Sequence, residues 1–400
     1  MGSDAESGRD PRFDFDAPVD RRGTSSFKWD FLKKVFGSED VLPMWVADMD
    51  IKAPPSVVES IVRRARHGVF GYTARPAELY EAAMRWFESR YGWKIERDWI
   101  LATPGVVPAL DLAIEAYTKP GDGVIIQPPV YYPFRDSVRR SGRRLVNNRL
   151  IRNGGRYLID MDGLERDCRR ASMLVLCSPH NPVGRVWTRE ELEQVVEVCS
   201  ESGVTIFSDE IHADIVFPGS AHVPTASLGE SAASATVSAF ATSKTFNLAG
   251  LQLSLTVISD SALRERFRKV LDRFHMGMSN IFGIAATTAA YAHGAPWLDS
   301  LLEYLDGGFD LLAEGLDGIP GITMTRPEGT FLAWLDCRGL GMDDDSLEEF
   351  FVHRARLGLN RGSTFGPGGE GHMRMNLACP RQTLATAIKR LEGAVAGLRG

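Results

Sequence analysis

The sequence predicts an α/β protein, with a mostly parallel sheet in a large domain and a smaller α+β C-terminal domain. Three observations lead to this fold class. The 400 residues are too many for one simple hydrophobic core, and no repeat or low-complexity tract interrupts them. From about Pro54 onward, amphipathic helical patterns alternate with short apolar runs, which is typical of strands covered by helices on both faces. Near Gly294 the pattern changes, which indicates a second and smaller unit.

The large domain is predicted to begin with two amphipathic helices, at 56–67 and 77–91. In the second of these, apolar residues recur at three- and four-residue spacing. A further helix is predicted at 189–200. Continuous apolar runs are predicted to be buried parallel strands, and they lie at 100–104, 124–127, 173–177, 204–208, 236–240 and 253–259.

The region beyond Gly294 is predicted to form the smaller domain. Its elements are a long helix, a strand at 330–335, a helix at 346–357, a strand at 372–377 and a final helix after residue 380. The segment before Pro54 precedes the regular alternation, so we expect it to be an arm that joins this domain. The predicted division is an N-terminal arm with part of the small domain at 1–48, a large domain at 49–290 and a small C-terminal domain at 291–400.

The composition argues against nucleic-acid and membrane partners. The net charge is −6 and 24% of the residues are charged, so the basic bias that attracts nucleic acid or anionic lipid is missing. No apolar run approaches the roughly 20 residues that span a bilayer, and the N-terminus has no signal-peptide pattern. We therefore expect a cytoplasmic protein that acts on small molecules and binds neither nucleic acid nor membrane.

The five cysteines are predicted to be buried free thiols. Their number is odd, they form no C-x-x-C pair, and two of them lie inside apolar strand or helix patterns. Such usage argues against a disulfide framework and against a zinc site, and we expect no bound metal.

A phosphate site is predicted where the apolar run at 100–104 ends. Ligands of open α/β sheets bind outside the carboxyl ends of the strands. Gly105, Val106 and Val107 follow this run and open a helix with Pro108 in its first turn. Free backbone amides and the helix dipole at such a position suit an anion.

Two further strand ends carry polar side chains. Asn181 follows the run at 173–177, in a turn made rigid by two prolines and a glycine, and its amide could donate to a phenolate oxygen. Asp209 follows the run at 204–208. A carboxylate beside an apolar strand end needs a partner, and a protonated ring nitrogen of a ligand would supply one.

Lys244 is the third polar residue at a strand end, shortly after the run at 236–240. A lysine that enters a site between small and apolar residues has a lowered pKa, which a Schiff-base amine requires. Because Asn181, Asp209 and Lys244 follow three successive predicted strands, we interpret them as one site.

A glycine-rich stretch at 366–371 satisfies the pattern G-x-G-x-x-G. It precedes a predicted strand instead of opening a helix after one, so we reject a dinucleotide site. We interpret it as a flexible loop that leads to Arg374.

Four motifs link the chain to a known family: 44–50 (MWVADMD), 70–72 (FGY), 208–214 (SDEIHAD) and 243–251 (SKTFNLAGL). With them the chain resembles the fold-type I pyridoxal-5′-phosphate (PLP) enzymes of the aminotransferase class I and II superfamily, from about Phe13 to the C-terminus. Within that superfamily it is most similar to the MalY/PatB group of cystathionine β-lyases and cysteine-S-conjugate β-lyases. The resemblance implies the fold-type I PLP-transferase fold.

The resemblance also implies how PLP is held. Lys244 would carry the cofactor as a Schiff base, Asp209 would pair with the pyridine nitrogen and Asn181 would hydrogen-bond the ring hydroxyl. Tyr131 falls where the family stacks an aromatic ring on the pyridine. Near the ring hydroxyl, aminotransferases usually have a tyrosine. This chain has His212 at that position, and in this it resembles the lyases.

The phosphate group is expected at one end of the site. The resemblance implies that Gly105, Val106, Val107 and Ser243 hold it. Tyr72 would reach it from a partner subunit, which requires a homodimer with its active site at the subunit interface.

The substrate is expected to be an amino acid whose α-carboxylate binds Arg374, with the backbone at Ala47 in contact and Tyr132 nearby. The chain departs from many aminotransferases at Ala241 and Gln252, where those enzymes have a phosphate-binding serine and arginine. Further residues that are expected to shape the pocket are Phe27, Trp29, Met276, Met278 and Asn280.

The reaction that the resemblance favours is α,β-elimination from cystathionine or a cysteine S-conjugate to thiol, pyruvate and ammonia. The alternatives are an aminotransferase, and a decarboxylating or oxidatively deaminating enzyme that acts on a cysteine S-conjugate in natural-product biosynthesis, for example of an antibiotic. From another class, the protein could be a PLP-binding regulator that acts through a protein partner. The sequence leaves the physiological substrate open.

Overall fold

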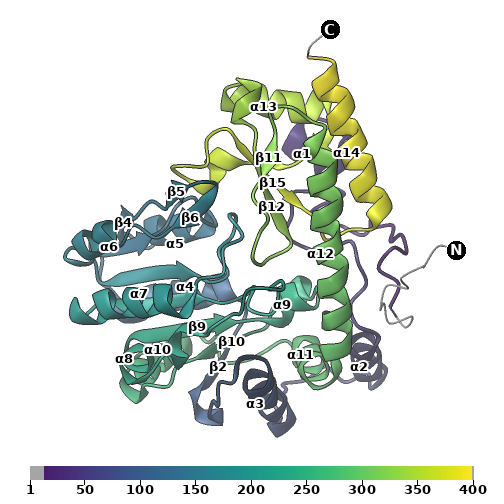
Figure 1. The fold of residues 1–400 in the computed structure, drawn as a ribbon. Coiled ribbons are helices and arrows are strands. Elements are labelled where there is room, and N and C mark those ends of the chain that lie inside the picture. The colour runs from purple at the N-terminus through teal and green to yellow at the C-terminus, as the bar shows by residue number, and fades with distance from the viewer. Residues whose placement is uncertain (1–12, 399–400) are drawn as a thin grey trace, which may run out of the picture.

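The computed structural model describes residues 13–398, so the first part of the expected arm, residues 1–12, lies outside it. Two main sheets divide the molecule, a seven-stranded sheet in the lower part of Figure 1 and a four-stranded sheet in the upper part. The long helix α12 (Ala295–Asp317) runs past both of them. This arrangement confirms the predicted fold class.

The large sheet has the strand order β2-β10-β9-β8-β7-β3-β4. Neighbouring strands are parallel, except that β10 runs antiparallel to both β2 and β9. Strand β4 is a partly exposed edge, whereas the other strands are buried along nearly their whole length. The strands are β2 (Ile100–Thr103), β3 (Gly123–Ile126), β4 (Arg144–Asn147), β7 (Met173–Cys177), β8 (Thr205–Asp209), β9 (Thr236–Phe240) and β10 (Ser254–Val257).

Helices cover both faces of this sheet, because successive side chains of a strand point to opposite sides. Val175 and Phe207 pack with α4, α5 and α10 on one face, and Leu174 and Ile206 pack with α6, α7 and α8 on the other. These helices are α4 (Val106–Tyr117), α5 (Pro133–Arg140), α6 (Met161–Cys168), α7 (Arg189–Glu201), α8 (Glu230–Ala235) and α10 (Ser261–Arg273). The continuous apolar runs therefore are strands buried from both sides.

Several helices begin at side chains that accept hydrogen bonds from otherwise unpaired backbone amides. Thr188 caps α7, Asp260 caps α10 and Asn280 caps α11. Each such cap stabilises a helix by about 1 kcal/mol. Helices α2 (Pro55–Arg66), α3 (Ala77–Tyr91) and α11 (Ile281–His293) pack together beside the large sheet.

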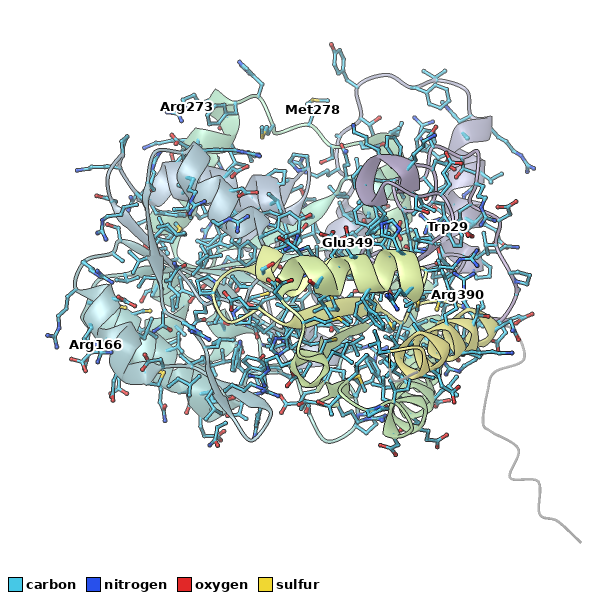
Figure 2. The ribbon with its side chains drawn as sticks, turned by 90° about the horizontal axis from the view of Figure 1, so that it is seen from above. Trp29, Arg166, Arg273, Met278, Glu349 and Arg390 are labelled. Carbon is cyan, nitrogen blue, oxygen red and sulfur yellow. The ribbon has the colours of Figure 1, made fainter. Side chains whose placement is uncertain are left out.

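The small sheet has the order β11-β12-β15-β14, and all its neighbours are antiparallel. Helix α14 packs against α12 next to it. Seen from above, Glu349 of α13 lies over the middle of the molecule, with Arg166 and Arg390 on opposite sides (Figure 2). The elements are β11 (Thr323–Met324), β12 (Leu332–Asp336), β14 (Asn360–Arg361), β15 (His372–Asn376), α13 (Asp344–Glu349) and α14 (Arg381–Ala396).

The helix predicted at 346–357 is wrong in its second half. Helix α13 ends at Glu349, a π-helical turn follows at Phe350–Arg354, and Leu357–Gly358 is a short strand, β13. The apolar residues that suggested a continuous helix instead fill the core of the C-terminal part.

The N-terminal segment meets the C-terminal part of the chain. It contains helix α1 (Leu32–Phe36) and strand β1 (Leu42–Pro43), and β1 pairs in parallel with β13. The division of the chain at residues 48 and 290 stays a prediction.

All five cysteines are buried and free, as the sequence predicted. Within residues 13–398, no helix is both long and apolar enough to cross a membrane. Outside the two main sheets, strands β5 (Ile151–Asn153) and β6 (Arg156–Leu158) form a hairpin.

Candidate active site

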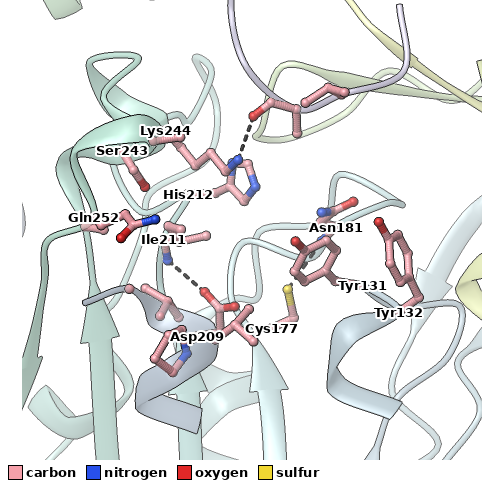
Figure 3. Close-up of a pocket in the computed structure, with 18 of the residues that line it drawn as sticks. Tyr131, Tyr132, Cys177, Asn181, Asp209, Ile211, His212, Ser243, Lys244 and Gln252 are labelled. Carbon is pink, nitrogen blue, oxygen red and sulfur yellow. Dashed lines mark hydrogen bonds between the residues drawn. The ribbon is translucent and has the colours of Figure 1, made fainter. Parts of the chain in front are cut away.

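A pocket of about 380 Å3 lies at the carboxyl ends of the central strands of the large sheet (Figure 3). Most of the sequence-predicted site residues line it: Ala47, Gly105, Val106, Val107, Tyr131, Tyr132, Asn181, Asp209, His212, Ser243, Lys244 and Arg374. Residues from distant parts of the chain are thus brought together. Their roles stay predictions.

Lys244 reaches the pocket from the short helix α9 (Thr242–Thr245), which follows β9. Its Nζ donates a hydrogen bond to the backbone oxygen of Ala47 at 2.6 Å, the contact drawn at the top of Figure 3. Burial, with a smaller contribution from the positive charge of Arg374, lowers the pKa of Lys244 to about 8. About a tenth of this amine is therefore unprotonated at pH 7, far more than of an ordinary lysine, and can act as a nucleophile or a base.

Asp209 is the last residue of β8 and lies at the floor of the pocket. One carboxylate oxygen accepts a hydrogen bond from the backbone amide of Ile211 at 3.1 Å. Burial raises the pKa of Asp209 to about 7. Among the described residues, one backbone hydrogen bond only partly offsets the loss of water around this buried carboxyl group. Such a group favours a cationic partner, such as a protonated ring nitrogen.

Asn181 and Arg374 are joined by a hydrogen bond. One Nη of Arg374 donates to Oδ1 of Asn181 at 2.9 Å, and both side chains are buried. Because Oδ1 of Asn181 is occupied, its amide N–H groups are the part available to a ligand.

Arg374 lies on β15 opposite Asn360 of β14. Its other Nη donates to Oδ1 of Asn360 at 2.6 Å and to the backbone oxygen of Trp45 at 2.9 Å. The guanidinium also lies 4.8 Å from the ring centre of Phe365, and its Nε is buried without a partner among the described residues. Burial lowers the pKa of Arg374 to about 10, so the group stays charged at neutral pH. Such a cation suits a carboxylate ligand.

The segment from Trp45 to Asp48 supplies backbone oxygens to both cations of the pocket. Trp45 binds Arg374 and Ala47 binds Lys244, as described above. Asn376 fixes this segment, because its amide nitrogen donates to the oxygens of Val46 at 2.6 Å and Asp48 at 2.5 Å.

A cluster of four charged residues and one tryptophan holds the other side of this segment. Its members, called the arm cluster below, are Arg21, Lys28, Trp29, Asp48 and Asp50. Arg21 contacts both carboxylates, and Lys28 Nζ and Trp29 Nε1 donate to Asp50 at 2.7 and 2.9 Å. Burial opposes ionisation of Asp50, but its partners, Lys28 above all, lower its pKa below the ordinary value. The N-terminal arm is thereby tied to the pocket by buried charge pairs.

Aromatic rings form one side of the pocket. Tyr131 and Tyr132 lie side by side in Figure 3, with ring centres 5.4 Å apart. Burial raises the pKa of Tyr131 to about 12, so it remains a neutral phenol. His212 is buried, its pKa is lowered well below the ordinary value by burial, and its Nδ1 has no partner in the described part of the chain. A neutral imidazole with a free nitrogen is available to a ligand.

The opposite end of the pocket is formed by backbone amides and small side chains. Gly105, Val106 and Val107 lie at the start of α4, and Ser243 and Gln252 lie near them in the lining. A helix N-terminus with a hydroxyl and an amide nearby suits a phosphate.

Some expected residues lie elsewhere. Tyr72 is 99% exposed and does not line the pocket of its own chain. Met278 is exposed at an outer edge of the molecule, and neither Met276 nor Asn280 lines the pocket (Figure 2). Trp29 belongs to the arm cluster, whereas Phe27 does line the pocket.

Cys177 and Asn360 are pocket residues that the sequence reasoning missed. Cys177 ends β7 directly beside Asp209 of β8. Its position at the end of a predicted strand could have indicated a pocket residue, but a cysteine in an apolar run is usually a core residue. Asn360 gave no signal, because only the pairing of β14 with β15 brings it to Arg374.

The set of groups fits the cofactor that the sequence suggested. A lysine amine suits an aldehyde, a buried carboxyl group suits a ring nitrogen and an amide N–H suits a phenolate. A tyrosine ring suits the pyridine face, and a helix N-terminus suits the phosphate. The buried and unpartnered nitrogens of His212 and Arg374 also indicate a polar ligand.

Comparisons with known proteins agree with this geometry. A family model described as aminotransferase class I and II matches residues 39–391. The cystathionine beta-lyase PatB of Bacillus subtilis is 42% identical over 384 residues, covering 95% of this chain and 99% of the relative. The protein MalY of Escherichia coli is 32% identical over 392 residues, covering 97% and 100%.

Solved structures of PLP-containing proteins are also similar to this chain. The structure of cystalysin from Treponema denticola, which contains PLP, matches with a TM-score of 0.93 at 37% identity and covers 96% of this chain and 99% of its own. A PLP-bound C-S lyase from Staphylococcus hominis matches with a TM-score of 0.89 at 31% identity, covering 96% and 98%. The chain therefore belongs to the aminotransferase class I and II family, in the group that includes PatB and MalY.

Proposed function

We propose that this protein is a PLP-dependent carbon–sulfur β-lyase, which cleaves cystathionine or another S-substituted cysteine to a thiol, pyruvate and ammonia. One observation carries the proposal: Asn181, Asp209 and Lys244, from three strand ends, face one pocket together with the buried Arg374. The similarity to PatB, a cystathionine beta-lyase, and to a C-S lyase structure favours elimination over the other reactions of the family.

Three residues hold and tune the cofactor in this proposal. When bound, PLP supplies a ring that withdraws electrons from the substrate carbon next to the amino group. Asp209 would keep the ring nitrogen protonated, and Asn181 would donate to the ring oxygen. Lys244 would hold the cofactor covalently through Nζ in the resting enzyme.

The substrate is oriented by its carboxylate. Arg374 binds both carboxylate oxygens, and the backbone at Ala47 and Trp45 lies beside them. Once Nζ of Lys244 is free, it takes the proton from Cα as general base, a role that the pKa of about 8 suits.

The elimination balances without an external oxidant or amino acceptor. The Cα proton goes to Lys244, and the electron pair of the Cβ–S bond leaves with sulfur, which takes a proton to become the thiol. The remaining three-carbon enamine takes up water and gives pyruvate and ammonium.

A product assay tests this function. The purified holoenzyme is mixed with S-methyl-L-cysteine in the absence of any keto acid, and pyruvate and methanethiol are measured. Equal amounts of both products are expected. Amino transfer that requires a keto acid and releases no thiol would instead identify an aminotransferase, and release of carbon dioxide would identify a decarboxylating enzyme.

We further propose that the enzyme is a homodimer in which Tyr72 completes the phosphate site of the partner subunit. Val69, Phe70 and Tyr72 are 62%, 59% and 99% exposed, and exposed apolar groups of this size favour a protein interface. The Tyr72→Ala and Lys244→Ala variants, each nearly inactive, are mixed and reassociated. If Tyr72 acts across the interface, about a quarter of the sites regain both residues, whereas a tyrosine acting in its own chain gives no recovery.

A cytoplasmic location is also proposed. The five free thiols support it, because reducing compartments keep thiols unpaired. Cell fractionation with an antibody to the protein tests it.

A further inference from the structure

The two ends of the pocket differ in chemistry. The phosphate end is formed by backbone amides and small polar groups around the start of α4. The other end surrounds Arg374 and is formed by the rings of Phe27, Trp45 and Tyr132. If Arg374 binds the α-carboxylate, as proposed above, the group carried by the substrate sulfur meets these rings.

Phe27 is the exposed member of this aromatic set, with 59% of its surface accessible, although it lines the pocket. Its ring centre lies 5.1 Å from that of Trp45 and 5.4 Å from that of Phe31. These tilted ring contacts hold an apolar ring in water at the pocket opening. An exposed apolar surface at such a place is typical of a binding site.

Trp45 is fixed behind Phe27. Its indole Nε1 donates to the backbone oxygen of Lys28 at 3.2 Å, and its ring packs edge-on against Phe36 at 5.6 Å. Its own backbone oxygen accepts from Arg374. The expected carboxylate site and the aromatic surface are therefore adjacent, which places the rings within reach of the rest of the substrate.

The pocket has few ionisable groups, and the proposed mechanism already uses the carboxylate and both cations among them. In the described part of the chain, the lining residues with carboxylate, imidazole or cationic side chains are Asp209, His212, Lys244 and Arg374. Cystathionine carries a second ammonium and a second carboxylate on the far side of its sulfur. Neither ion finds a charged partner in this lining, and desolvating an unpaired ion beside apolar rings is costly.

We infer that the enzyme prefers cysteines whose sulfur carries an uncharged group with an aromatic or broad apolar face, and that it uses cystathionine less well. This inference rests on the proposed β-lyase function and narrows it to a substrate class. Phe27, Trp45 and Tyr132 are the specificity-determining residues, and Phe27 is the one whose removal disturbs the fold least, because it is exposed.

Competing substrates test the inference. For the wild-type holoenzyme, kcat/KM for pyruvate release is measured with S-benzyl-L-cysteine, S-methyl-L-cysteine and L-cystathionine. The expected preference for S-benzyl-L-cysteine over L-cystathionine is roughly 10- to 100-fold, which is the discrimination that a few apolar contacts give. Phe27→Ala is expected to lower kcat/KM for the benzyl substrate about tenfold, and for the methyl substrate by much less, because a methyl group makes few contacts with the rings.

A matched control is Phe274→Ala, which removes another exposed phenylalanine that does not line the pocket. It is expected to change none of the three values. Phe27→Leu keeps an apolar group and is expected to retain part of the preference.

Binding without turnover provides a second readout. In 2-amino-5-phenylpentanoate, norvaline and 2,7-diaminosuberate, methylene replaces the sulfur of the benzyl, methyl and cystathionine substrates, so no C–S bond can break. Calorimetry should give the phenyl analogue the lowest Kd, and Phe27→Ala should raise the Kd of that analogue more than those of the other two.

The outcomes separate the inference from the function on which it rests. Pyruvate release with cystathionine equal to or better than the benzyl substrate, or a preference that survives Phe27→Ala, overturns the inference and leaves the lyase function standing. Absence of pyruvate from all three substrates overturns the lyase function itself.

Discussion

The two walls of the pocket are built in different ways. The strand-end wall, which consists of Asn181, Asp209 and Lys244, comes from residues that lie at or within four positions of the ends of β7, β8 and β9. The arm wall, which consists of Phe27, Trp45, Ala47 and Arg374, comes from the N-terminal segment and from a strand of the small sheet.

The proposed roles follow the same division, with cofactor chemistry at the strand-end wall and substrate binding at the arm wall. The strand-end wall is fixed by a buried sheet, so groups that must stay aligned with a cofactor are held rigidly there. The arm wall is assembled from side-chain contacts to backbone oxygens between distant segments. If the arm wall binds the substrate, as proposed above, changes in it are expected to alter which substrate is accepted without disturbing the large sheet.

The largest effect is expected from the strand-end wall. Lys244→Ala removes the proposed base and covalent anchor, and kcat is expected to fall by roughly 10^3-fold or more. Pyruvate release from S-methyl-L-cysteine measures it. Lys269→Ala, which alters an exposed lysine on α10, is the control and should leave kcat unchanged. Undiminished turnover in Lys244→Ala would refute the assignment.

The arm wall should respond mainly in KM. Arg374→Lys keeps the charge but loses the planar fork, so a carboxylate is no longer bound by two parallel hydrogen bonds. The value of kcat/KM is expected to fall by roughly 10- to 100-fold. The matched control Arg166→Lys changes an exposed arginine and should have no effect. A fall in kcat alone, with KM unchanged, would argue against carboxylate binding at Arg374.

The pH dependence of PLP binding tests the chemistry of Lys244 in the strand-end wall. Because burial lowers the pKa of Lys244 to about 8, its reactive unprotonated fraction rises with pH below that value and levels off above it. The rate at which the cofactor-free protein binds PLP, followed by absorbance, should rise about tenfold per pH unit below pH 7 and reach a plateau above pH 8. A rate that keeps rising to about pH 10, as an ordinary lysine amine would give, contradicts the lowered pKa.

The smallest effect is expected within the arm cluster. Trp29→Phe keeps a ring beside Arg22 but removes the indole N–H that donates to Asp50. The free energy of unfolding should fall by about 1.5–3 kcal/mol at neutral pH. Because the folded state lowers the pKa of Asp50, this stabilisation is present above the unfolded pKa and is lost as pH falls through the folded one.

Denaturant titration of Trp29→Phe at pH 7 and in acid measures this difference, which should shrink in acid. Trp99→Phe, a tryptophan outside the cluster, is the control. A loss that is the same at both pH values would mean that the indole stabilises the arm by packing alone.

The same contrast explains what the sequence could predict. Strands such as β7 and β9 are continuous apolar runs, and their bounds were predicted without error. The polar residues after them were found because parallel strands end at one edge of the sheet. The apolar runs and the rule that parallel strands end at one edge of the sheet were therefore sufficient to predict the residues of the strand-end wall.

The arm wall needed more than local pattern. Arg374 and Ala47 were expected only through a family resemblance, and Asn360 was not expected at all. Strands β1 and β13 are two residues long and form only by pairing with each other, so no periodicity marks them. The arm cluster joins positions more than 20 residues apart, and charge pairs at such separations leave no pattern in the sequence.

The hydrogen bond from Arg374 to Asn181 crosses from one wall to the other. It fixes which end of the asparagine amide points into the pocket, because the oxygen is taken and the N–H groups are left for a ligand. If Arg374 binds the substrate carboxylate and Asn181 donates to the ring, as proposed above, a carboxylate that draws the guanidinium away would also change the contact of Asn181 with the ring. The carboxylate end and the expected ring end of the pocket are thus linked through one side-chain contact.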